Sequence, residues 1–76
     1  MIKEHDCVVL TANLPNQGLE AGDVGTVVHL HSGGQAYEVE FATLTGVTVA
    51  VVTLLASQVR PLDRRDLPHT RQLAPA

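Results

Sequence analysis

Cysteine and aromatic residues are scarce in this chain of 76 residues, which has one Cys, one Tyr, one Phe and no Trp. A single cysteine excludes an internal disulfide, so the stability of so small a domain has to come from a closed apolar core or from association with another chain. A groove for proline-rich peptides needs several aromatic side chains on the surface. Since both aromatics are expected in the core, recognition of that kind is excluded.

Basic residues are nearly absent from most of the chain. Residues 1–59 hold one base, Lys3, against six acids, a net charge of −5, whereas residues 60–76 hold four arginines against two acids, a net charge of +2. An acidic body repels phosphate backbones, because nucleic-acid affinity depends on cationic side chains that displace counterions. We therefore expect no nucleic-acid partner, and nucleic-acid binding through the arginines of residues 62–76 ranks last among the hypotheses.

Long apolar runs are also missing. None reaches the roughly 20 residues of a membrane-spanning helix, and the opening MIKEHD lacks the apolar stretch of a signal peptide. Hydrophobic residues make up 45% of the chain and charged residues 17%, the balance of a folded globule with room for one core. We expect a single soluble, cytoplasmic domain with no membrane partner.

β-branched and apolar residues gather in short stretches separated by turn residues. The breaks at Gly33-Gly34 and Thr45-Gly46 have the composition of hairpin turns, and Pro61 ends the last stretch because it lacks an N–H donor. The stretches are residues 5–11, 24–31, 36–42, 47–54 and 58–61. This pattern predicts an all-β fold, a small five-stranded antiparallel barrel of residues 1–61, followed by a mobile tail of residues 62–76.

Alternation in the third stretch indicates which side chains face the inside of the barrel. Tyr37, Val39 and Phe41 fall on one strand face, and Glu38 and Glu40 fall on the other. We therefore place the first three in the core. With them we expect inward side chains at Val8, Leu10, Val24, Val28, Leu30, Val49, Val51 and Val59.

Gly22 and Gly25 flank Asp23 where the chain enters the second strand. We interpret both glycines as backbone requirements, since a phosphate cradle needs more glycines, a following helix and a lysine. Gly25 also marks a predicted bulge that shifts this strand by one position.

Four segments occur in order within residues 5–62, and they are HDCVVLT, LEAGDVGTVVHLH, AYEVEF and TVAVVTLLASQVRPL. They resemble a family of very short bacterial proteins of unknown function, with the general form D-x-V-V-L-T, G-D-V-G-T-V-V, Y-x-V-E-F, V-A-V-V-T-L and V-R-P. Two features depart from that pattern. Leu55 stands where a polar residue is usual, and the arginine-rich tail lies outside the shared region.

The resemblance implies a Src-homology-3-like barrel, of the sort found in the nitrile hydratase β subunit and in small photosynthetic-complex subunits, where the barrel docks on a larger protein. It also implies an antitoxin or immunity role, because family members can be encoded beside small toxin-like proteins. It carries over no catalytic motif and no cofactor.

Histidine and cysteine side chains form the strongest chemical pattern, with His5 and Cys7 in the first predicted strand and His29 and His31 in the second. Within each pair the side chains share a strand face, so neighbouring strands would bring four zinc-type ligands together. Against this, same-face neighbours stand about 6.6 Å apart along a strand, and the register between the strands is open. A metal-binding protein or a small metal-dependent enzyme is therefore the alternative function, and solvated surface histidines are the preferred interpretation.

Two further catalytic hypotheses each have a simpler structural alternative. Cys7 as a nucleophile competes with Cys7 as a small core residue, and Glu38 with Glu40 as an acid–base pair competes with two solvated strand charges. We expect the protein not to be an enzyme.

The fourth predicted strand is apolar on both faces, although only one face can fill the barrel. We therefore expect a non-catalytic interaction module that binds a protein partner or itself through the outward face of this strand, with no cofactor. Glu38 and Glu40 bias the choice of partner towards basic surfaces. The predicted partner-binding residues are Leu44, Val47, Ala50, Val52, Leu54 and Leu55, together with Glu38 and Glu40.

Overall fold

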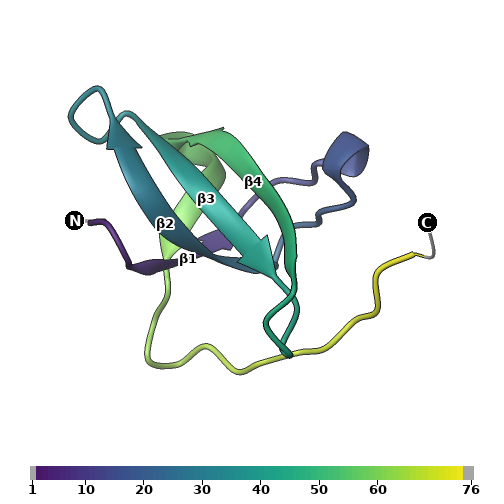
Figure 1. Cartoon of the computed structure of the whole chain (residues 1–76). Helices are drawn as coiled ribbons and strands as arrows, with labels where there is room; N and C mark the ends of the chain where they lie inside the picture. Colours follow the sequence, from purple (N-terminus) through teal and green to yellow (C-terminus); the bar gives the residue numbers. More distant parts are fainter. Residues whose placement is uncertain (1, 75–76) are drawn as a thin grey trace.

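The computed structural model describes residues 2–74, which form one antiparallel sheet of five strands in the order β4-β3-β2-β1-β5 (Figure 1). These residues contain two short 3-10 helices and no α-helix, and none of their helices is long and apolar enough to cross a membrane. The elements are β1 (Cys7–Leu10), η1 (Pro15–Gln17), β2 (Val24–His31), β3 (Ala36–Ala42), β4 (Thr48–Leu55), η2 (Ala56–Gln58) and β5 (Val59–Pro61). The predicted all-β, five-stranded antiparallel fold is confirmed, and it is consistent with a small Src-homology-3-like barrel.

Both predicted hairpin turns depend on residues that accept a positive φ. Gly33 and Gly34, between β2 and β3, have φ of 68° and 98°, and Gly46, between β3 and β4, has φ of 94°. Glycine adopts such angles without a Cβ clash, so these positions reverse the chain at little cost. The long connection between β1 and β2 carries η1 instead.

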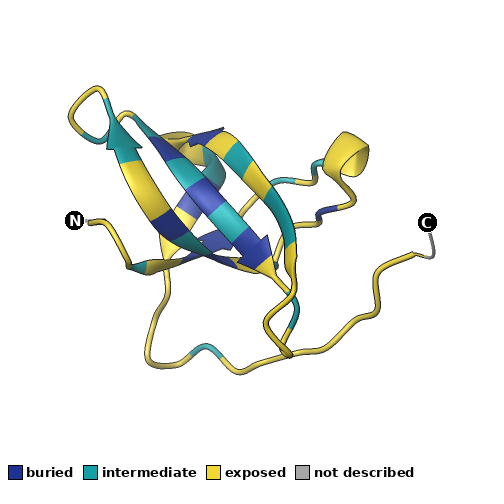
Figure 2. Ribbon diagram, viewed as in Figure 1, coloured by how far each residue is buried: buried dark blue, intermediate teal, exposed yellow. Residues whose placement is uncertain are grey.

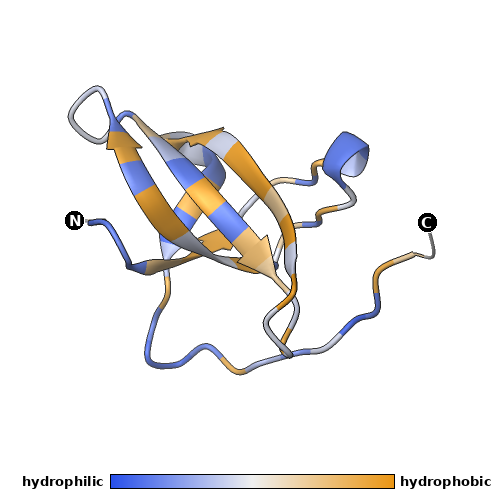
Figure 3. Cartoon of the chain, in the orientation of Figure 1, coloured by the Kyte–Doolittle hydropathy of each residue, from blue (hydrophilic) through white to orange (hydrophobic). Residues whose placement is uncertain are grey.

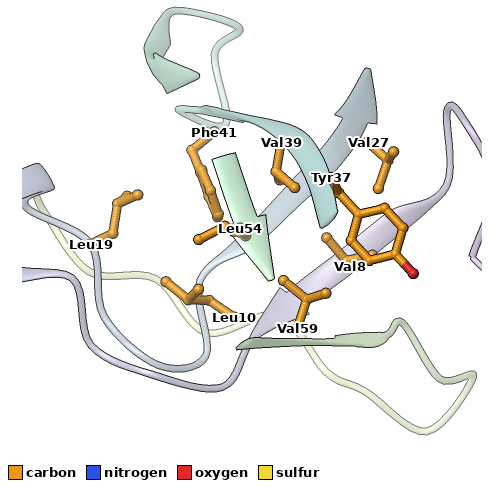
Figure 4. Packing of buried hydrophobic residues seen from close by; sticks show 9 residues of the cluster. All are labelled: Val8, Leu10, Leu19, Val27, Tyr37, Val39, Phe41, Leu54 and Val59. Carbon is orange, nitrogen blue, oxygen red and sulfur yellow. The ribbon is translucent and has the colours of Figure 1, made fainter. Parts of the chain in front are cut away.

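The core lies between the two curved halves of the sheet, where one face of each strand is buried (Figures 2 and 4). Nine buried hydrophobic residues form one cluster: Val8, Leu10, Leu19, Val27, Tyr37, Val39, Phe41, Leu54 and Val59. The predicted inward positions of Tyr37, Val39 and Phe41 are confirmed, as are those of Val8, Leu10 and Val59. Leu30 is partly buried and packs against the cluster.

The first connection also supplies a core residue that the strand pattern does not predict. Leu19 follows η1 and is 3% exposed. Its N–H and C=O both bond to Leu14 across an isolated bridge, at 3.1 and 2.8 Å. This bridge holds the loop so that Leu19 packs with Leu10 and Phe41 in the cluster (Figure 4).

The predicted inward positions of Val24 and Val28 in β2 are wrong, because both side chains are exposed, at 48% and 39%. Val27 faces the core instead. The register with β3 shifts between Val27 and His29, so the bulge lies at Val28 and not at Gly25. Gly25 is buried because the strands approach closely there: a Cβ on it would lie 2.5 Å from Val39 Cγ1.

The predicted orientation of β4 is reversed. Pairing with β3 places Leu54 opposite Tyr37, Val52 opposite Val39 and Ala50 opposite Phe41, so these three β4 side chains lie on the core side. Val51, which was expected inward, is 56% exposed on the other face, and Val49 lies at a second register shift and is only partly buried. Figure 3 shows why the sequence misleads, since hydrophilic and hydrophobic residues alternate along β3 whereas β4 is hydrophobic along most of its length.

Residues 62–74 contain no helix or strand, yet two arginine clamps tie them to other parts of the chain. Arg60 donates two hydrogen bonds to the Asp66 carboxylate, at 2.8 and 2.9 Å. Arg71 donates two to Asp23, at 2.6 and 2.9 Å, and one to the carbonyl of Gly18 at 3.0 Å. The sequence pattern indicates neither clamp, and mobility of the tail stays a prediction.

Candidate interaction surface

The solvent-facing side of β3 and β4 carries two acidic residues beside a row of β-branched and apolar side chains. The register places Glu38 opposite Thr53 and Glu40 opposite Val51. We call this surface the outer face, and it comprises Glu38, Glu40, Thr48, Val51, Thr53 and Leu55.

Each glutamate of the outer face is bonded to its neighbours. Glu38 accepts a hydrogen bond from the Thr53 hydroxyl at 2.7 Å and lies 2.7 Å from His31 Nε2, while Glu40 accepts one from the Thr48 hydroxyl at 2.6 Å. The bonds from Thr53 and His31 to Glu38 lower its pKa below the ordinary value, so its carboxylate is charged at neutral pH. Glu38 therefore presents a fixed negative charge on the outer face.

Apolar side chains continue from the outer face into the β3–β4 turn. Val51 is 56% exposed and Leu55 59%, and in the turn Val47 is 63% and Leu44 87% exposed. Three of the predicted partner-binding residues, Leu44, Val47 and Leu55, are therefore accessible to a partner. No charged residue interrupts β4, whose sequence is TVAVVTLL.

Three of the predicted partner-binding residues do not face outward. Leu54 is 1% exposed and belongs to the core, while Ala50 and Val52 lie on the same inner face and are partly buried. Val51 takes their place on the surface. The sequence offers no signal for this choice, because either face of β4 is hydrophobic enough to be the buried one.

The side of β4 away from β3 is an unpaired sheet edge (Figure 1). Backbone groups alternate between the two sides of a strand. Ala56 donates its N–H to the carbonyl of Gln35 on the β3 side, so Leu55, Thr53 and Val51 direct theirs to the free side. There the Gln58 side chain caps the N–H of Leu55 at 2.9 Å.

The histidine and cysteine pattern does not assemble into one cluster. His5 precedes β1 in a left-handed turn with φ of 74°, and Cys7 is paired with Thr26 rather than with a histidine. His29 and His31 touch edge to face, with ring centroids 4.7 Å apart. Among residues 2–74 no group of three or more His, Cys, Asp or Glu side chains is placed to hold a metal ion, so the geometry gives the metal hypothesis no support.

Two of the depressions on the surface of the described residues lie beside chemically interesting side chains. One, of about 430 Å³, lies among Leu30, Tyr37, Val59 and neighbouring glycines, and the other, of about 300 Å³, borders Cys7 and Asp6. Figure 4 shows the Tyr37 hydroxyl pointing away from the other labelled side chains. Neither depression gathers the nucleophile, base and orienting group that covalent catalysis needs.

Comparison with known proteins gives one match. Neither the curated proteins nor the solved structures contain a significant match to the chain. A family model described as a domain of unknown function (DUF4926) matches residues 4–61. Since this stretch covers most of the chain and runs from before β1 to the end of β5, the protein belongs to the DUF4926 family.

Proposed function

We propose that the protein is a non-catalytic interaction module that binds a protein partner or a second copy of itself through the outer face of β4. The observation that carries this proposal is the exposure of Val51 and Leu55 on a strand that has no charged residue. Fully burying one such side chain stabilises a complex by about 1.5–3 kcal/mol before the cost of association. Together with Val47 and Leu44 in the β3–β4 turn, these two side chains form an apolar strip that is long enough for a modest interface.

Charge and family context narrow the kind of partner. The ionised carboxylate of Glu38 and the acidic side chain of Glu40 flank the apolar strip, so a basic partner surface complements them. An antitoxin-like or inhibitory role in the bacterial cytoplasm is one form of this function. It is supported by the resemblance to short bacterial proteins encoded beside toxins.

Charged substitutions on the outer face test the proposal. Val51→Asp and Leu55→Asp should each abolish capture of a partner by the tagged protein, because each removes an apolar side chain that the contact buries and puts in its place a carboxylate that loses its hydration. Leu67→Asp is the matched control, since Leu67 is 88% exposed in the tail. Thermal melting should stay near that of the wild type for all three. If the complex survives both substitutions in β4, the outer face is not the binding surface.

A further inference from the structure

We propose that two copies of this chain associate through the free edge of β4, pairing their β4 strands antiparallel so that one continuous sheet runs through both molecules. The proposal rests on the function proposed above and develops its second alternative, a copy of the chain itself, which meets the free edge of β4 and not the acidic side chains of the outer face. Strand addition at an open sheet edge is a recurring way in which proteins recognise one another.

The free edge of β4 offers a set of unused backbone groups. The N–H and C=O of Val51 and Thr53 point to this side, and no described residue bonds to their N–H groups there. Pairing Val51 with Thr53 of the second copy, and Thr53 with Val51 of that copy, forms four main-chain hydrogen bonds around a two-fold axis at Val52. Self-pairing in this register satisfies all of the unused groups at once.

The opposite edge of the sheet, at β5, is closed by the chain itself. The N–H of Val59 bonds to the carbonyl of Ala56, and Pro61 has no N–H. Arg60 donates a hydrogen bond to the carbonyl of Pro61 at 3.1 Å. Natural sheets protect their edges with proline and charge. β5 has these devices, whereas β4 has no proline and no charged residue, and the capped N–H of Leu55 lies at its very end, which marks β4 as the edge open to pairing.

Charge and side-chain shape favour a second copy as the occupant. β4 itself is uncharged, so two β4 strands meet without repulsion. Glu40 of one copy and Glu38 of the other are then three strand spacings apart, about 14 Å. This distance exceeds the screening length of about 8 Å at physiological salt. Val51 facing Thr53 is a pair of β-branched side chains, the type that packs best across neighbouring strands.

The contact is small, so the dimer is expected to be weak. One pair of strand edges with flanking side chains lies at the low end of specific interfaces, below about 1,200 Å² of total buried area. Light scattering coupled to gel filtration should show the mass rising from 8.1 kDa towards twice that value as the concentration increases from about 10 µM to about 1 mM.

A proline substitution distinguishes the role of the free β4 edge from that of the outer face. Thr53→Pro removes the N–H that points to the free side and leaves the ladder with β3 intact, so it should remain monomeric across the whole concentration range. Thr53→Val, which loses the hydroxyl but keeps the N–H, should still dimerise. A wild type that stays monomeric, or a Thr53→Pro variant that still dimerises, overturns the proposal.

Amide hydrogen exchange of the wild-type protein tests β4 self-pairing without any substitution. The amides of Val51 and Thr53 should gain protection as the concentration rises, whereas that of Lys3, which bonds to Asp6 within its own turn, should not change. Equal exchange of Val51 and Thr53 at both concentrations contradicts self-pairing. That result leaves the binding function itself standing, because partner capture and its loss in Val51→Asp are measured separately.

Discussion

Gly25 lies in β2 with its backbone against the side chains of β3. A Cβ at this position would stand 2.5 Å from Val39 Cγ1, 2.9 Å from the Glu40 carbonyl oxygen and 3.0 Å from Phe41 Cε1. The carbonyl belongs to β3, which is paired on both sides, and cannot move without disturbing its ladder. Gly25 is thus needed for close strand packing, which differs from the turn glycines with their positive φ.

Gly25→Ala is therefore expected to destabilise the fold, by about 1–3 kcal/mol, as overpacking in a core usually does. Chemical denaturation followed by circular dichroism measures the free energy of unfolding. Ser57→Ala, in the exposed turn of η2, should change it by less than about 0.5 kcal/mol. Equal stability of Gly25→Ala and the wild type would mean that the strands are further apart than described.

Asp66 carries a second prediction at the scale of single residues. Its pKa is lowered from 3.8 to about 2, by the hydrogen bonds from Arg60 and then by the N–H of Asp63. Because the folded-state pKa lies below the unfolded value, the stability that this clamp contributes is fully present above pH 3.8 and is lost as the pH falls towards 2. NMR titration of the Asp66 carboxyl should give this midpoint, and Arg60→Ala should move it up towards 3.8. An unchanged midpoint in that variant would assign the shift to another cause.

At the scale of the strand, adjacent leucines at the end of β4 report its orientation. Leu54 is 1% exposed within the core, and Leu55 is 59% exposed on the outer face. Leu54→Ala should lower the free energy of unfolding by about 2–5 kcal/mol, and Leu55→Ala by less than about 0.5 kcal/mol. Denaturant titration of both variants checks this contrast. The reverse order would mean that Leu54, and not Leu55, faces the solvent.

The strands differ in how far their sequences determine them. β3 alternates apolar and acidic residues, so the inward positions of Tyr37, Val39 and Phe41 follow from the pattern alone. β4 is apolar on both faces, and its orientation depends on the register set by the turn at Gly46 and on the shift near Ala42. A one-residue shift exchanges the two faces, which is why the predicted surface included Leu54 and left out Val51.

The sequence therefore predicts which strand carries the candidate surface, but not which of its side chains face outward. The acidic pair Glu38 and Glu40 was located correctly, since alternation in β3 places both outward. The bulge at Val28 exchanges the two faces of β2 for the residues that follow it. A single valine in a valine-rich stretch gives no sign of such a bulge. Contacts between residues far apart in the chain, such as Arg71 with Asp23, leave no periodic pattern at all.

For the whole molecule, the barrel of residues 1–61 should fold without the tail. Residues 62–74 contribute no side chain to the buried cluster, and their main ties are the two arginine clamps. Burial alone would raise the pKa of Asp23, but the hydrogen bond from Arg71, the N–H of Glu20 and the charge of Arg71 outweigh it and lower this pKa. Ion pairs with this exposure are worth about 0.2–1 kcal/mol each.

Removing residues 62–76 should consequently lower the free energy of unfolding only slightly and leave the far-ultraviolet spectrum of a β protein, because exposed ion pairs stabilise a fold weakly. Thermal and chemical denaturation of the shortened chain measure the loss. Arg71→Ala in the full chain is the control, and it should lower the free energy of unfolding by less than removal of the whole tail does. A shortened chain that no longer unfolds cooperatively would make the tail an integral part of the domain.

The closed edge at β5 limits how large an assembly of this protein becomes. A fibre grows only when each molecule offers two adhesive margins, one to the molecule before it and one to the molecule after it. Here Pro61 and the occupied N–H of Val59 leave the β5 margin without a donor, so one adhesive margin remains. Concentrated solutions should accordingly stop at pairs and stay clear, despite a strand whose composition alone would favour aggregation.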